Sequence, residues 1–110
     1  MKELTKEQMM HAIKNGEFEE ELINGDKVAI VLTQGWCPQW HAMKPYLDDI
    51  NAEIYVLVYD EVDYFDQVRE FKESKWKNDQ VPYVRYYSKG KLVNQSNFVQ
   101  KEEFNALISS

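Results

Sequence analysis

The stretch VAIVLTQGWCPQW, residues 28–40, decides the fold. Residues 28–32 are all apolar and largely β-branched, the pattern of a strand buried on both faces in the middle of a parallel sheet covered by helices. Gly35 breaks this strand, and Pro38 suits the first turn of a helix. The stretch therefore predicts a buried strand that leads through a short turn into a helix.

The residues on either side of this stretch predict further helices and strands in alternation. Thr5 and Gln8 have the spacing of a capping box, and Lys89-Gly90 fits a tight hairpin turn. We expect helices over 5–13, 17–23, 38–50 and 101–108, another around Val68 and Phe71, and strands over 28–32, 54–58, 81–87 and 92–98.

This order predicts one α/β domain over residues 1–110, a three-layer sandwich. Its sheet is expected to be mixed and four-stranded, with a parallel pair, a C-terminal antiparallel hairpin and helices on both faces.

Composition excludes several classes of protein. A formal net charge of −6 argues against a nucleic-acid partner or an anionic membrane, since phosphate binding uses clustered Lys and Arg. No apolar run approaches the ~20 residues that cross a bilayer, and the charged first residues do not resemble a signal peptide, so we expect no membrane partner and a cytoplasmic location. A single cysteine cannot form an intramolecular disulfide. With no phosphate loop and no ligand cluster, we expect no cofactor and no metal.

Cys37 is the candidate reactive residue. It follows a buried strand at the start of a helix, where ligands bind in open α/β sheets. Free backbone N–H groups and the helix dipole stabilise a thiolate at this position, whereas a free cysteine can also be an inert apolar side chain. His41 lies one helical turn further on and either stabilises the thiolate or is simply solvated.

Other conspicuous residues have simpler interpretations. The acidic residues between Asp60 and Asp66 lack the glycine and terminal glutamate of a calcium loop and are expected to form a solvated turn. Tyr83, Arg85 and Tyr87 share one face of a strand, where we expect them to pack on the sheet.

Several of these motifs together resemble the thioredoxin superfamily. The family motif is Trp-Cys-Gly-Pro-Cys after a buried strand, with a proline in the following helix and a cis-proline later in the chain. Trp36-Cys37, Pro45 and Val81-Pro82 match these positions, and the resemblance covers about residues 27–108. Trp40 stands where the family has its second, resolving cysteine. Dithiol chemistry therefore cannot operate in this chain.

The resemblance implies a substrate groove around Cys37, which is expected to be at least partly accessible. The expected groove residues are Trp36, Pro38, Trp40, Val81 and Pro82. Trp40 has a second interpretation, in which its indole fills the core below the site.

Two functional hypotheses follow. In the first, Cys37 takes part in cell redox homeostasis as a monothiol thiol–disulfide oxidoreductase. It attacks a protein disulfide or an oxidised low-molecular-weight thiol, forms a mixed disulfide and depends on an external resolving thiol. In the second, the chain is a redox-inactive module that binds a partner through the same groove. The sequence leaves open whether the protein is an enzyme.

Overall fold

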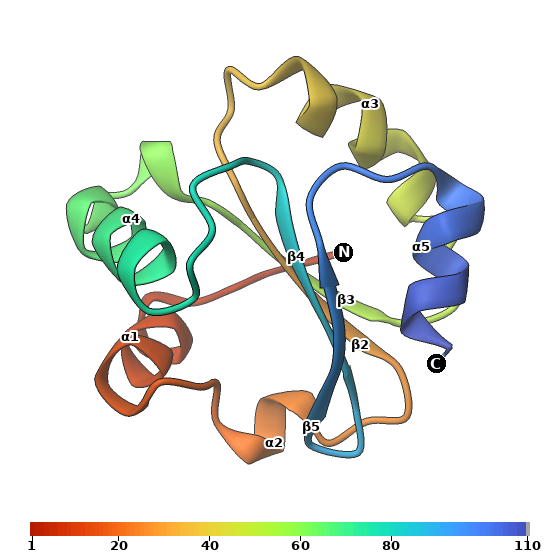
Figure 1. Ribbon diagram of the computed structural model, residues 1–110, viewed down its shortest axis with the longest axis horizontal. Helices are drawn as coiled ribbons and strands as arrows, with labels where there is room; N and C mark the ends of the chain where they lie inside the picture. The colour runs from red at the N-terminus through yellow and green to blue at the C-terminus, as the bar shows by residue number, and fades with distance from the viewer. Residues whose placement is uncertain (110) are drawn as a thin grey trace.

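The computed structural model describes residues 1–109. Figure 1 shows a central twisted sheet with helices on either side. In chain order the elements are β1 (Lys2–Glu3), α1 (Lys6–Asn15), α2 (Glu20–Ile23), β2 (Val28–Thr33), α3 (Pro38–Leu47), β3 (Glu53–Val58), the 3-10 helix η1 (Tyr59–Glu61), α4 (Phe65–Ser74), β4 (Tyr83–Ser88), β5 (Lys91–Ser96) and α5 (Lys101–Ile108).

The sheet has the strand order β1-β3-β2-β4-β5. β2 pairs in parallel with β3 and antiparallel with β4, and β4 and β5 form the C-terminal hairpin. All six residues of β2 are buried, as the apolar run predicts. The predicted α/β class, parallel pair and hairpin are confirmed.

The prediction of four strands is wrong, because the sheet formed by residues 1–109 has five. Lys2 and Glu3 of β1 pair in parallel with Tyr55 and Val56 of β3. Both β1 side chains are charged and exposed, so no apolar pattern marks this strand in the sequence.

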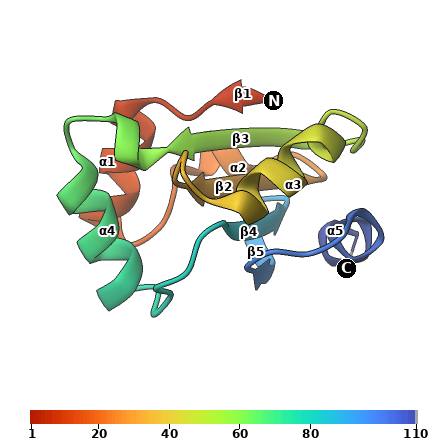
Figure 2. The ribbon, with the colours of Figure 1, turned by 90° about the horizontal axis from the view of Figure 1, so that it is seen from above.

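The sheet separates two apolar cores. Helices α1, α2 and α4 cover one face, where residues such as Met9, Phe71 and Tyr87 are buried. Helices α3 and α5 cover the other, where Trp40, Met43 and Phe104 are buried. In Figure 2 the strands follow one another from β1 at the top to β5 at the bottom, with α1 and α4 on one side and α3 and α5 on the other.

The ends of two helices differ from the prediction. The capping box at Thr5 and the left-handed Gly16 bound α1 as expected. The helix predicted over 17–23 is present only over Glu20–Ile23, since Glu17 turns inward and accepts a hydrogen bond from the Phe18 N–H. The helix predicted over 38–50 ends at Leu47 and is followed by turns.

The C-terminal hairpin turns at Lys89 and Gly90, whose φ angles are 53° and 83°. Positive φ at both central residues is the geometry of a two-residue hairpin turn, and glycine adopts it without steric cost. The pairing of β4 with β5 shifts register between Tyr86 and Tyr87. β5 is therefore both the last strand of the sheet and an irregular one.

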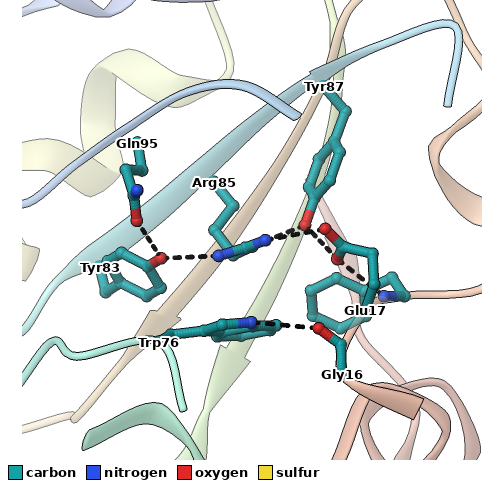
Figure 3. Close-up of polar contacts among 8 residues, drawn as sticks. Gly16, Glu17, Trp76, Tyr83, Arg85, Tyr87 and Gln95 are labelled. Carbon is teal, nitrogen blue, oxygen red and sulfur yellow. Dashed lines mark hydrogen bonds and ion pairs between the residues drawn. The ribbon is translucent and has the colours of Figure 1, made fainter. Parts of the chain in front are cut away.

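A polar network lies on the face of β4 that packs toward α1 and α4 (Figure 3). Arg85 is 6% exposed, and its guanidinium donates to the hydroxyl of Tyr87 at 2.7 Å, to the hydroxyl of Tyr83 at 2.9 Å and to Oε1 of Glu17 at 2.8 Å. The guanidinium carbon also lies 4.0 Å from the centre of the Trp76 ring. Tyr83, Arg85 and Tyr87 thus form more than the simple sheet packing predicted for them.

One more residue, Gln95, and a second contact of Glu17 complete this network. Tyr83 donates to Oε1 of Gln95 on β5, and Tyr87 donates to Oε2 of Glu17 at 2.6 Å. The network joins the loop before α2 to both strands of the hairpin. It thereby fixes the strand that begins directly after Pro82, beside Cys37.

Within residues 1–109, no helix is long and apolar enough to span a membrane.

Candidate functional site

Cys37 is the N-cap residue of α3, with Pro38 at the first helical position. The buried strand β2 ends at Thr33, and residues 34–36 form the turn into the helix. Proline is well suited to the first helical position, because the N–H that it lacks would have no partner within the helix. The sequence therefore places the cysteine at the helix start by local rules alone.

Side chains from η1 and α3 hold the turn before Cys37. The Gly35 N–H donates to Oδ1 of Asp60 at 2.9 Å, and Nε2 of His41 lies 2.6 Å from the Gly35 carbonyl oxygen. The Gln34 amide donates to the hydroxyl of Tyr59 at 3.0 Å, and burial raises the pKa of Tyr59. The turn is thus fixed on both sides of Gly35.

Cys37 lies in a groove of about 430 Å³ between this turn and the loop that precedes β4. Trp36 stands at its rim with 65% of its surface exposed, and its indole N–H donates to Oε1 of Gln34. The remaining lining residues are Gln34, Pro38, Gln39, Tyr59, Glu73, Asp79, Gln80 and Val81. The site thus combines one thiol, one exposed aromatic ring and several polar groups.

The structure brings together four of the predicted site residues: Trp36, Cys37, Pro38 and Val81. Pro82 follows in the chain through a cis peptide bond, but it is buried and does not line the groove.

Trp40 also lies outside the groove. Its side chain is 3% exposed in the core between the sheet and α3, as the second interpretation of this residue held. It lines a different cavity, of about 320 Å³, with Lys2, Lys44 and Val56.

The expectation that Cys37 is at least partly accessible is wrong. The residue is 4% exposed, and its thiol donates to the Val81 carbonyl oxygen at 3.4 Å. The burial follows from packing: Cys37 belongs to the core that α3 and α5 form with the sheet, and residue 81 covers its sulfur. The His41 ring is held at the Gly35 carbonyl, so the structure gives it no contact with the sulfur.

Residues that the sequence analysis did not single out hold the loop that carries Val81. The side-chain amides of Asn78 and Asn97 bond to each other in both directions at 3.0 Å. Asn97 also donates to the Pro82 carbonyl oxygen at 3.0 Å, which ties the end of β5 to the loop. No local pattern identifies this pair, because its members are 19 residues apart and lie in different loops.

Lys72 in α4 also holds the loop that carries Val81. Its side chain is fully buried, and its ammonium donates to the Asn78 carbonyl oxygen at 2.9 Å and lies 5.6 Å from the centre of the Tyr83 ring. Burial lowers the pKa of Lys72 to about 8, although the carboxylates of Glu73 and Asp79 favour its charged form. A buried lysine thus underlies the wall of the groove.

The described residues 1–109 contain no group of three or more His, Cys, Asp or Glu side chains arranged to hold a metal ion.

No family model and no curated protein matches this sequence. Solved structures do match the fold. Thioredoxin O1 from Arabidopsis thaliana, in its oxidized state, superposes with a TM-score of 0.68 and 12% identity, over 96% of this chain and 92% of that one. Fasciola hepatica thioredoxin gives a TM-score of 0.66 and 14% identity, over 99% and 97% of the two chains.

Glutaredoxins match as well. The buckwheat glutaredoxin–glutathione complex gives a TM-score of 0.59 and 18% identity, over 96% of this chain and 90% of that one. At these identities the likeness shows the fold alone. This chain has a thioredoxin-like fold.

Proposed function

We propose that this protein is a one-cysteine thiol–disulfide exchange factor that acts in cell redox homeostasis in the cytoplasm. The observation that carries the proposal is the position of Cys37 at the N-terminus of α3, in contact with Val81 and on the lining of a groove with an exposed indole at its rim. The thioredoxin-like fold supports the assignment, and a related fold crystallised with glutathione supports a thiol partner in general.

The exchange proceeds in two steps. The Cys37 thiolate attacks one sulfur of a partner disulfide, so that a mixed disulfide forms while the other partner sulfur leaves as a thiolate and takes up a proton. Because the chain contains no second cysteine, the thiolate of an external thiol must then attack the partner's sulfur in the mixed disulfide. A disulfide forms between the external thiol and the partner, and Cys37 leaves as a thiolate. Ionisation of Cys37 removes the hydrogen bond to Val81 and frees the sulfur to turn toward the groove.

A second function has its own supporting observation. Cys37 is 4% exposed and donates its proton to a carbonyl oxygen, a contact that stabilises the neutral thiol. Under this alternative the groove binds a partner without redox chemistry.

Reaction of the folded protein with 4,4′-dithiodipyridine at neutral pH distinguishes the two functions. A matched reference is the variant Cys37→Ser/Ser109→Cys, which carries a single thiol at an exposed position. We expect Cys37 to release thiopyridone at least as fast as this reference, because the helix N-terminus favours the thiolate.

A native rate about a hundredfold below the reference, recovered when urea unfolds the chain, would contradict exchange and favour the binding module. Cys37→Ser should release no thiopyridone and corrects for background.

A further inference from the structure

The groove around Cys37 carries negative charge on its lining. Glu73 at the end of α4 and Asp79 in the loop before β4 both line it, and both are exposed. Among residues 1–109, neither carboxylate forms an ion pair, and the groove lining includes no Lys, Arg or His. Both carboxylates are therefore available to a bound partner.

More negative charge lies beside the Trp36 rim. Asp60 binds the Gly35 N–H at 2.9 Å, and the carboxylate of Glu61 approaches so closely that a Cβ on Gly35 would meet Oε2 at 3.0 Å. Trp36 follows Gly35 directly, and its exposed ring lines the same groove as Glu73 and Asp79.

Of the nearby cationic groups, Lys72 offsets part of this charge, since the carboxylates of Glu73 and Asp79 favour its charged form. Its ammonium is buried, however, and donates to the Asn78 carbonyl oxygen rather than lining the groove. The His41 ring is engaged at the Gly35 carbonyl. A cationic side chain from a partner would thus meet unpaired carboxylates and, at Trp36, an aromatic face that attracts cations.

We infer that the Cys37 groove selects an extended, lysine- or arginine-rich segment of a partner protein. This inference rests on the proposed function, because it names the class of partner that the same groove binds. It disfavours glutathione as the partner, because that tripeptide has more carboxylates than amines and would bring net negative charge next to Glu73 and Asp79.

The test uses noncovalent binding, so that it does not depend on Cys37 chemistry. Three cysteine-free, fluorescein-labelled peptides of equal length carry lysine, glutamine or glutamate at alternating positions. We expect the lysine peptide to bind at least about tenfold tighter than the glutamate peptide at low salt, by fluorescence anisotropy, and the difference to shrink as salt screens the charges.

Two double variants show whether the groove itself makes the selection. Glu73→Gln/Asp79→Asn removes the lining carboxylates, and we expect it to abolish most of the lysine preference. Glu7→Gln/Glu102→Gln changes the net charge equally at exposed sites on α1 and α5, and we expect it to retain the preference. The inference would be overturned if both double variants lost the lysine preference equally, if all three peptides bound with equal affinity, or if none of them bound.

The outcome is separable from that of the proposed function. Lysine preference that persists in Cys37→Ser, together with an unreactive Cys37 in the native protein, supports the inference and contradicts exchange. Rapid reaction of Cys37 with no charge preference among the peptides supports exchange and overturns the inference.

Discussion

Trp40 is three residues after Cys37 in α3, one helical turn further on, and its indole is 3% exposed. We expect Trp40→Cys to form a disulfide with Cys37, since a helical turn brings two Cα atoms within the ~7 Å that a disulfide requires. Loss of a buried indole should lower the free energy of unfolding by about 3 kcal/mol or more.

The measurements are thiol titration after oxidation and reduction of a protein disulfide in the presence of a dithiol. The matched control is Trp40→Ser, which creates a similar cavity without a thiol. A folded Trp40→Cys protein that retains two free thiols after oxidation would refute the inferred geometry at the helix start.

Lys72 gives the unfolding free energy a specific pH dependence. Its pKa is about 8 in the folded chain against an ordinary value of 10.5, so the unfolded chain binds the additional proton between these two values. The stability of the wild-type protein relative to Lys72→Met should therefore be lowest below pH 8 and should rise as the pH increases toward 10.5.

Urea unfolding of both proteins at several pH values measures this difference. Both chains contain the same tyrosines, so the contribution of tyrosine ionisation cancels when the two unfolding free energies are subtracted. We expect the unfolding free energy of the wild type minus that of Lys72→Met to increase by about 2 kcal/mol between about pH 7 and pH 10. Lys75→Met, at an exposed position just after α4, should show no such increase. A flat difference for Lys72→Met would mean that the pKa of Lys72 is not lowered in the folded state.

At the scale of elements, β4 depends on an ion pair whose two members are unequally buried. The side chain of Arg85 is 7% exposed and that of Glu17 is 38% exposed. We expect Glu17→Gln to lower the free energy of unfolding by about 2 kcal/mol, because it leaves a buried guanidinium without its counter-ion. We expect Arg85→Met to lower it by less. In Arg85→Met the remaining carboxylate is partly hydrated, and Tyr83 and Tyr87 keep Gln95 and Glu17 as partners.

Denaturant unfolding of both variants tests this order. Glu19→Gln, at an exposed neighbouring position without a side-chain cap bond, is the control and should have little effect. If Arg85→Met proved the more destabilising variant, the stacking of Arg85 on Trp76, rather than its charge, would dominate the network.

The elements that are defined by patterns among neighbouring residues could be predicted from the sequence. The apolar run of β2, the capping box at Thr5, the Lys89-Gly90 turn and the proline after Cys37 each act over a few neighbouring residues. They sufficed for the α/β class and for the position of the cysteine at a helix start.

What could not be predicted depends on contacts between distant residues. Arg85 and Glu17 are 68 residues apart, and the charged pair Lys2-Glu3 becomes a strand only because β3 offers an edge. The burial of Cys37 likewise depends on Val81, 44 residues later in the chain. Sequence patterns locate the thiol, whereas the packing of a separate loop determines how much of it is exposed.

At the scale of the whole molecule, the two outer strands determine whether the sheet can grow by adding another chain. An open edge is a template for backbone pairing with a second copy, and short or irregular edge strands discourage it. On one side β1 has only two residues, both charged. On the other, the register shift at Tyr86/Tyr87 twists the hairpin locally, and β5 begins with the exposed Lys91. Both borders of the sheet are therefore poor templates for intermolecular strand addition, which leaves side-chain surfaces, rather than open backbone, to make contact with other proteins.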